Sequence, residues 1–370
     1  MALSSTIQST LLRYQREINA ALHSAIAEVA AQTGTRDTDS FYGQIQYHLG
    51  WVDANLVPTQ NNTGKLLRST LVLMAYEIAG AWGLTPETTG TEHLQRALPA
   101  AAAVELTHNF TLIHDDIEDG DTERRHRPTV WTIWGMPQAI NTGDGLHSLA
   151  RLVLWKVLDR GVDGLIAIRL ADTLDRASLI LTEGQHLDIS FEQRSDISVA
   201  MYLDMIRRKT ASLMACSAEM GACLGTDNQE TIRLLRKFGD AIGIAFQVRD
   251  DLLGVWASSA ESGKTPAGDI YRRKKSLPIL HALERANAQG RQTLAEIYQQ
   301  DTPVTARQVE EVLTTMQHTH TKAYCRQFLA AQCHLAYEVL KSIPHHTNPL
   351  SIRAYHDLEI MVRFIEEAAH

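Results

Sequence analysis

Apolar residues recur at steps of three and four positions along most of this chain, and this spacing constrains the possible folds more than any other feature. Near the N-terminus the recurring positions are Leu11, Ile18, Leu22, Ile26 and Val29. A helix places residues at such steps on one face, which packs against a core. Six later segments share the pattern: Leu66–Ala81, Leu94–Ile117, Ile166–Ile189, Met201–Leu224, Thr231–Val255 and Val304–Leu340. We find no convincing alternation of apolar and polar residues bounded by turns, so we expect an all-α protein without strands.

Stretches rich in glycine, proline and small polar residues separate these segments and indicate loops. They cover residues 34–39, 58–64, 83–90, 120–128, 135–145, 258–269 and 345–349. Because none has the length or the bias of an interdomain linker, the sequence predicts a single domain over residues 1–370. Within this domain, residues 1–40 are expected to form an N-terminal helical extension and residues 41–370 the main bundle.

The composition narrows the class of protein. Of the 370 residues, 44% are hydrophobic and 21% are charged, which excludes a disordered chain, a collagen and a disulfide scaffold. The formal net charge of −8 argues against a general nucleic-acid binder, because such proteins usually need a basic face. The cysteines, at positions 216, 223, 325 and 333, are expected to be small core residues of helices.

Neither a leader nor a membrane span is predicted. Residues 1–18 contain no apolar run followed by a small-residue cleavage site, so we expect no signal peptide. The most apolar stretch, residues 69–84, is interrupted by Glu77 and is too short to cross a bilayer. These features predict a soluble, cytoplasmic protein.

An acidic motif closes one of the predicted helices. Asp115 and Asp119 are four residues apart and share a helix face, with Asp116 one step around, and Gly120 follows. Like charges at this spacing, and carboxylates at a helix C-terminus, are unfavourable unless a cation offsets them. Clustered carboxylate oxygens suit Mg²⁺, which shares its remaining positions with water and substrate phosphates. A solvated acidic turn is the alternative, because further acidic residues lie beside the motif.

A second acidic pair, Asp250 and Asp251, closes another apolar helix and makes the metal interpretation stronger. If the two helices are neighbours, the pairs face each other and hold a metal cluster that neutralises a diphosphate leaving group. Basic residues accompany both motifs, as expected for phosphate contacts. They are Lys65, Arg68, Arg124, Arg125, Lys209, Lys264 and Lys274.

These motifs resemble those of the trans-isoprenyl diphosphate synthases, also called polyprenyl synthetases, over residues 41–369. Asp115-Asp116-x-x-Asp119 resembles the first aspartate-rich motif of that family, and Asp250-Asp251 resembles the start of the second. Further matches are Gly64-Lys65-x-x-Arg68, His108, Gln185, Asp188, Lys209-Thr210, Phe246-Gln247 and the 269–278 stretch. The resemblance implies a helical bundle of the isoprenoid synthase type, with a central active-site cavity, and a homodimer.

The resemblance also implies roles for individual residues. Three Mg²⁺ ions would bridge an allylic diphosphate to Asp115, Asp119 and Asp250. Isopentenyl diphosphate would be held by Lys65, Arg68, His108 and Arg125, and the allylic diphosphate by Arg124, Lys209 and Lys264. Asp116, Thr210, Gln247 and Lys274 complete the expected catalytic and substrate-binding set, with Thr210 and Gln247 stabilising a carbocation through their dipoles.

The implied reaction is ionisation of an allylic diphosphate (dimethylallyl, geranyl or farnesyl), attack by the double bond of isopentenyl diphosphate, and loss of a proton. Phe110 and Thr111, five and four residues before Asp115, are the expected floor of the product pocket. An aromatic residue followed by a small one resembles short-chain synthases that make a C20 product, geranylgeranyl diphosphate. Farnesyl diphosphate, C15, is the alternative product. The alternative role for Phe110 is that of an ordinary core residue.

The sequence departs from the family pattern at several positions. Gly254 stands where the second motif usually ends in aspartate, which would weaken one water-mediated metal contact. Other departures are Leu66, Ser69, His126 and Ser276. None removes a residue expected to bind metal directly, so we expect an active enzyme.

Two other functions fit the same fold. A terpene cyclase ionises an allylic diphosphate without a second substrate, but it has no use for Lys65, Arg68, His108 and Arg125. A non-catalytic partner subunit of a heteromeric synthase tends to lose the acidic motifs, whereas both leading pairs are intact here. A purely structural helical protein would leave the paired aspartates unexplained.

Overall fold

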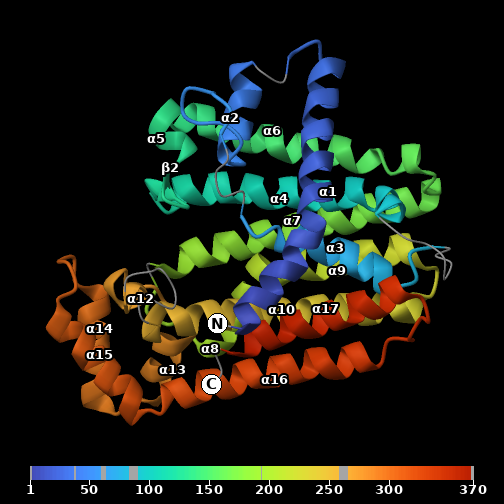
Figure 1. The fold of residues 1–370 in the computed structure, drawn as a ribbon. Helices are drawn as coiled ribbons and strands as arrows, with labels where there is room; N and C mark the ends of the chain where they lie inside the picture. Colours follow the sequence, from blue (N-terminus) through green and yellow to red (C-terminus); the bar gives the residue numbers. More distant parts are fainter. Residues whose placement is uncertain are drawn as a thin grey trace. The chain divides into compact units, whose positions relative to one another are not determined.

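The computed structural model describes residues 2–36, 39–59, 64–82, 91–192, 194–257 and 266–367, and the part it describes is almost entirely helical (Figure 1). The N-terminal half contains α1 (Ala2–Gln32), α2 (Ser40–His48), α3 (Leu67–Ile78), α4 (Leu98–Glu118), α5 (Val130–Trp134), α6 (Met136–Trp155) and α7 (Gly164–Glu192). The second half contains α8 (Val199–Ile206), α9 (Ser212–Gly225), α10 (Gln229–Trp256), α12 (Gly268–Tyr271), α13 (Leu277–Arg285), α14 (Ala288–Gln299), α15 (Ala306–His318), α16 (Thr321–Lys341) and α17 (Pro349–Glu366). The prediction of an all-α fold is confirmed.

Shorter elements are also present among the described residues. The 3₁₀ turns are Glu92–Arg96 and Leu158–Arg160, and a π-helical turn covers Arg207–Ala211. Two strands of two residues each, β1 (Glu123–Arg124) and β2 (Arg127–Pro128), pair antiparallel, with Glu123 opposite Pro128. This small hairpin was not predicted from the sequence, because strands of two residues show no periodicity.

Contacts divide the chain into two compact units, each described by itself. The first comprises residues 1–178, 216–236 and 343–358, and the second comprises residues 179–215, 237–342 and 359–370. The organisation as a single domain remains a prediction.

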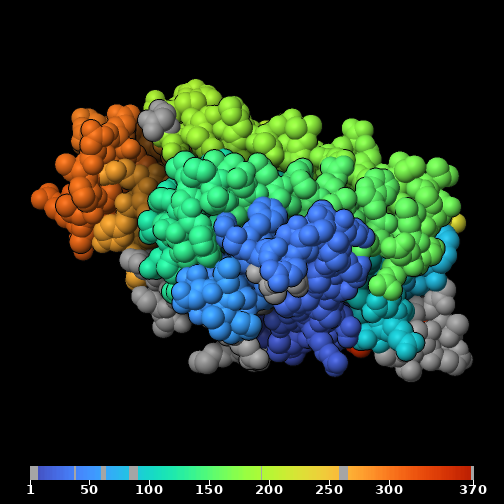
Figure 2. All heavy atoms as spheres, turned by 90° about the horizontal axis from the view of Figure 1, so that it is seen from above, coloured from blue at the N-terminus to red at the C-terminus, as the bar shows by residue number. Residues whose placement is uncertain are grey.

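The first unit is built around α4. Its alanines, Ala100–Ala103, are buried, and such small side chains let neighbouring helices approach closely. Helix α4 packs on α6, α3 and α1. The N-terminal segment also contacts α6, and Figure 2 shows its blue surface lying against the green surface of the unit. Cys216 and Cys223 are buried in this unit, as predicted for core residues.

In the second unit, α13 packs against α8, α14, α15 and α16. Its core includes Leu277, Leu280 and Leu329, all with at most 1% of their surface exposed. Cys325 and Cys333 on α16 are buried as well, which confirms the prediction for all four cysteines.

The loop predicted over residues 135–145 is wrong, because α6 begins at Met136 and runs through it. Its glycines are packing positions rather than breaks. A Cβ atom added at Gly143 would lie 2.3 Å from Nε2 of His114, and one at Gly145 would lie 2.4 Å from the Phe41 ring. Glycine is therefore needed where these side chains cross the helix.

Two long predicted helices are interrupted. The segment 304–340 is divided between α15 and α16 at His320, whose φ of 53° is left-handed and ends a helix. The segment 201–224 contains the π-helical turn Arg207–Ala211 between α8 and α9. Apolar spacing continues through both interruptions, so periodicity alone does not reveal them.

Candidate active site

The first acidic motif lies at the C-terminal end of α4, in the first unit. Asp115 is half-buried and Asp119 is exposed, whereas Asp116 is 1% exposed. The β1–β2 hairpin returns the chain so that Arg124 Nε lies 2.6 Å from Asp116 Oδ1. Burial raises the pKa of Asp116 to about 6, although Arg124 acts in the opposite direction. Asp116 therefore positions Arg124, and the carboxylates of Asp115 and Asp119 are the more accessible ones.

Basic side chains gather near the start of α3 in the same unit. Arg68 Nη1 lies 3.1 Å from Nε2 of His108, and Lys65 is exposed just before the helix. Gly64 has a φ of +85°, and a Cβ atom there would lie 2.7 Å from the guanidinium of Arg125. Glycine at position 64 thus lets Arg125 lie against the Gly64–Arg68 segment. Four residues predicted from the sequence are brought together in this way: Lys65, Arg68, His108 and Arg125.

The histidines of this basic cluster are neutral. Burial lowers the pKa of His108 well below its usual range, and Arg68 and Arg125 lower it further. The pKa of His48 on α2 is also well below its usual range, mainly because of burial and further because of Arg125 and Arg124. His48 was not predicted from the sequence, because it lies well before the basic motif with nothing to link it to that motif. A neutral imidazole can donate a hydrogen bond to an anion without adding to the repulsion among the arginines.

The second acidic motif lies near the C-terminal end of α10, in the second unit. The Asp250 side chain is 37% exposed, whereas Asp251 is fully buried. Asp251 accepts hydrogen bonds from the Tyr202 hydroxyl at 2.6 Å and from Gln247 Nε2 at 3.2 Å. Asp250 is therefore the residue of this pair that is accessible to a ligand. Tyr202 was missed, since a tyrosine at a helical core position carries no distinctive signal.

Lys274 also contacts this motif, with its Nζ 3.5 Å from Asp251 Oδ1. Burial acts to lower the pKa of Lys274, but the carboxylates of Asp251 and Asp269 outweigh it and the pKa is raised. The lysine therefore remains charged beside the acidic pair.

The π-helical turn presents Lys209 and Thr210 in the second unit. Lys209 Nζ lies 2.6 Å from Asp188 Oδ2, and Thr210 Oγ1 donates to Gln247 Oε1 at 3.0 Å. A Cβ atom at Gly184 of α7 would lie 2.2 Å from the backbone nitrogen of Lys209. This close approach places the α7 segment of Gln185 and Asp188 beside the turn. Single π turns inside helices occur frequently at functional sites.

The expected chain-length residues lie one turn before Asp115. The Phe110 ring meets the His147 ring of α6 edge-on, with centroids 4.8 Å apart, and it also contacts His114. Thr111 is buried and its hydroxyl donates to the carbonyl of His108 at 2.8 Å. The Phe110 ring thus packs against an imidazole of the neighbouring helix α6.

The donors of Asp115, Asp119 and Asp250 are hard carboxylate oxygens of the kind that Mg²⁺ prefers. Within the described ranges, no three histidine, cysteine, aspartate or glutamate side chains form a group that could hold a metal by themselves. Mg²⁺ usually takes one or two protein carboxylates plus substrate phosphates and water. Lys264, predicted to contact the allylic diphosphate, lies outside the described residues.

The family profile described as polyprenyl synthetase matches residues 50–316 of the chain. The chain belongs to this family. It is 39% identical over 273 residues to a (2E,6E)-farnesyl diphosphate synthase of Mycobacterium tuberculosis, covering 74% of this chain and 72% of that protein. It is 36% identical over 303 residues to a geranylgeranyl diphosphate synthase of the same species, covering 82% and 80%.

Among solved structures, a polyprenyl synthetase from Streptomyces coelicolor A3(2) is similar over 97% of this chain and 99% of its own, with 31% identity and a TM-score of 0.83. The present chain is therefore a short-chain trans-prenyltransferase with the all-α isoprenoid synthase fold, as the motifs predicted. No helix among its described residues has the length and apolarity needed to cross a membrane.

Proposed function

We propose that this prenyltransferase condenses isopentenyl diphosphate with an allylic diphosphate to give geranylgeranyl diphosphate in a Mg²⁺-dependent reaction. The observation that carries the proposal is the contact of Arg68 with His108 beside Arg125. This basic cluster gives the first unit a set of cations in addition to its acidic motif, as an enzyme with two diphosphate substrates requires. A cyclase of the same fold needs no such second cluster.

In this proposal the basic cluster binds isopentenyl diphosphate. Lys65 and Arg68 supply charge at the start of α3, Arg125 supplies a bidentate contact, and neutral His108 donates a hydrogen bond. The allylic diphosphate is neutralised by Arg124, Lys209 and Lys264. Arg124 is held by Asp116 and Lys209 by Asp188, so that neither cation has to be ordered when substrate arrives.

Asp115, Asp119 and Asp250 would hold Mg²⁺, which supplies charge neutralisation for the departing diphosphate when bound. The residues of the chain then stabilise the allylic carbocation. The hydroxyl of Thr210 and the amide of Gln247, which are hydrogen-bonded to each other, direct fixed dipoles at the cation. The double bond of isopentenyl diphosphate attacks the cation, and proton loss to the departing diphosphate completes the product.

The proposed C20 length of the product depends on Phe110. Its ring is supported by His147, so it has a defined position as a floor for the growing chain. The curated relatives include both a farnesyl and a geranylgeranyl diphosphate synthase, and C15 therefore remains the alternative product.

The active form in this proposal is a homodimer. A run of apolar side chains is exposed at the end of α6, in the following 3₁₀ turn and at the start of α7: Leu152, Trp155, Leu158, Leu165 and Ile168. Leu165 alone exposes 78% of its surface. Exposed apolar residues concentrated in one such segment are typical of a protein interface, and the second copy of the chain is the partner that the family resemblance predicts.

The test is incubation with Mg²⁺, isopentenyl diphosphate and each allylic primer, followed by separation of the products. A synthase consumes isopentenyl diphosphate and releases a longer prenyl diphosphate. Release of a cyclic hydrocarbon without consumption of isopentenyl diphosphate would establish the cyclase, and absence of any turnover would favour a non-catalytic subunit. The Asp115→Ala variant should lose turnover by at least about a hundredfold while it remains folded.

A further inference from the structure

The turn of the β1–β2 hairpin has an unusual backbone conformation. Arg124 pairs with Arg127, so the loop of the hairpin consists of Arg125 and His126 alone. Their φ angles are +54° and +60°, both in the left-handed region. A two-residue hairpin turn with positive φ at both positions favours asparagine and glycine, and longer side chains adopt it at a cost in free energy. The turn of this chain therefore needs support from outside the hairpin.

Arg127 supplies this support by binding to α2 and to the loop that follows it. Its two terminal guanidinium nitrogens donate to the carbonyl of Tyr47 at 3.0 Å and to the carbonyl of Val52 at 2.9 Å. The central guanidinium carbon lies 4.0 Å from the centroid of the Tyr47 ring, which is a cation–π contact. These three contacts direct the guanidinium into the protein and fasten β2 to residues 47–52.

Tyr47 is itself held in a fixed position. It is only 4% exposed, and its ring meets the Trp134 ring of α5 edge-on, with centroids 5.1 Å apart. The Tyr47 hydroxyl donates to the carbonyl of Pro128 in β2 at 2.7 Å. The hairpin is therefore fastened twice, by the Arg127 side chain on the α2 backbone and by the Tyr47 side chain on the β2 backbone.

The two arginines that precede His126 depend on the turn to different degrees. Arg124 has its own ion pair with Asp116 of α4, at 2.6 Å. Arg125 lies in the turn itself, and its guanidinium lies 2.7 Å from the position that a Cβ atom would take at Gly64. The direction of the Arg125 side chain thus follows from the conformation of the turn, whereas Arg124 is also fixed through its side chain.

We propose that Arg127 is a positioning residue for isopentenyl diphosphate, because it holds the left-handed turn in the conformation that directs Arg125 toward the basic cluster. This inference rests on the proposed function, in which Arg125 binds that diphosphate. Arg127 acts through Arg125 and leaves the allylic diphosphate almost unaffected, since Asp116 holds Arg124 independently of the turn.

The first variant is Arg127→Met, which keeps the apolar stem and removes the guanidinium. Calorimetric titration of isopentenyl diphosphate into the full chain should give a Kd about tenfold higher than that of the unmodified chain. In the condensation assay the KM for isopentenyl diphosphate should rise alike, whereas kcat and the KM for geranyl diphosphate should stay within about threefold. A purely structural role would lower the active fraction, and thus kcat, with both KM values unchanged. Unchanged affinity in folded Arg127→Met would overturn the inference.

Arg96→Met is the matched control, because Arg96 makes the same kinds of contact before the other end of α4. Its side chain donates to the carbonyls of Gly161 at 2.8 Å and Leu224 at 3.4 Å. Its guanidinium carbon lies 5.6 Å from the centroid of the Trp82 ring. Arg96→Met should lower stability, but it should bind isopentenyl diphosphate within about twofold of the unmodified chain.

A double variant, Arg127→Met with His126→Gly, separates positioning from direct binding. Glycine adopts a positive φ without steric cost, so the turn should keep its conformation without the contacts of Arg127. The Kd for isopentenyl diphosphate should return to within about threefold of that of the unmodified chain. A raised Kd that His126→Gly does not restore would overturn the inference, because Arg127 would then act on the diphosphate itself.

If Arg127→Met does not fold, Tyr47→Phe decides, because it removes only the hydroxyl that donates to Pro128. A Kd for isopentenyl diphosphate raised about threefold or more supports the inference, and an unchanged Kd overturns it. Isopentenyl diphosphate that binds to the unmodified chain but is not condensed would instead refute the proposed function, while the comparison of Kd values still decides the role of Arg127.

Discussion

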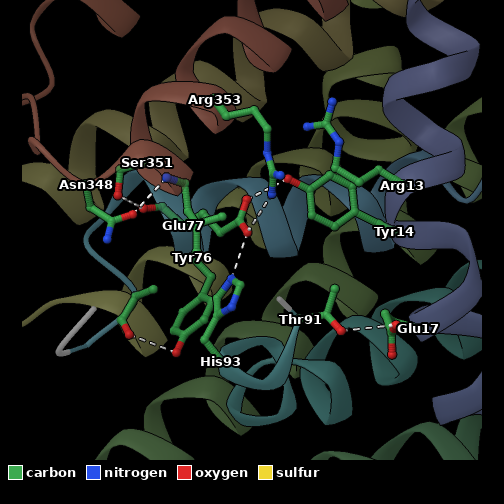
Figure 3. A network of polar contacts seen from close by, with 12 residues as sticks. Arg13, Tyr14, Glu17, Tyr76, Glu77, Thr91, His93, Asn348, Ser351 and Arg353 are labelled. Atoms are coloured by element: carbon green, nitrogen blue, oxygen red, sulfur yellow. Dashed lines mark hydrogen bonds and ion pairs between the residues drawn. The ribbon is translucent and has the colours of Figure 1, made fainter. Parts of the chain in front are cut away.

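The hydroxyl of Tyr14 on α1 donates a 2.6 Å hydrogen bond to the carboxylate of Glu77 on α3, and both side chains are buried (Figure 3). Glu77 Oε1 lies 2.8 Å from His93 Nε2 and 3.6 Å from an amino nitrogen of Arg353 on α17. The carbonyl of Glu77 accepts from the Ser351 hydroxyl. Helix α1 precedes the region that matches the family profile, yet this network fastens it to the core of the first unit.

We expect Tyr14→Phe to destabilise the protein by about 1–3 kcal/mol, because it removes one donor from a buried carboxylate. The free energy of unfolding in urea measures this effect. Tyr271→Phe is the matched control, since Tyr271 is exposed, and it should change stability by less than about 0.5 kcal/mol. Equal effects of the two substitutions would show that the Tyr14–Glu77 contact contributes nothing specific.

Gly143→Ala should destabilise the protein by about 1–3 kcal/mol, because the added methyl group would collide with the His114 ring. Since His114 precedes Asp115, activity should fall together with stability. Gly164→Ala is the control: this glycine also lies in a helix, and a Cβ atom there meets nothing within 4 Å. The shifts in melting temperature of the two variants, relative to the unmodified chain, should differ in sign or by several degrees. Equal shifts would show that the His114 ring does not restrict position 143.

Asp116 should give a pH-dependent contribution to stability. Its pKa is about 6 in the folded chain against 3.8 as its ordinary value, so the folded state binds the proton more tightly. The contribution is therefore fully present below about pH 4 and is lost as the pH rises through 6. Unfolding in metal-free buffer should show the unmodified chain losing stability relative to Asp116→Asn between these pH values. A constant difference would show that burial does not raise this pKa.

The sequence predicted those parts of the fold and site that follow from local pattern. Helical spacing placed α7 and α10 to within a few residues, and the clustered charges pointed to the acidic pairs that contain Asp115 and Asp250. Tertiary contacts determined what it missed. Gly143 is a packing position inside α6, because only glycine leaves room for the His114 ring there. The Tyr202 hydroxyl donates a hydrogen bond to Asp251, a residue 49 positions away.

Phe110→Ala should lengthen the product by at least one isoprene unit, because it removes the ring that His147 supports. The rate of condensation should stay within about tenfold of the unmodified chain, since the substitution leaves the charged residues in place. Phe328→Ala, on α16, is the control and should leave the product length unchanged. An unchanged length in Phe110→Ala would dismiss Phe110 as the floor.

The most direct test of the account is the fate of labelled isopentenyl diphosphate when the unmodified chain is given farnesyl diphosphate as primer with Mg²⁺. We predict that one unit is added, that label accumulates in geranylgeranyl diphosphate and that elongation stops there. Label confined to unreacted isopentenyl diphosphate, with each of the shorter primers also left unextended, would contradict it.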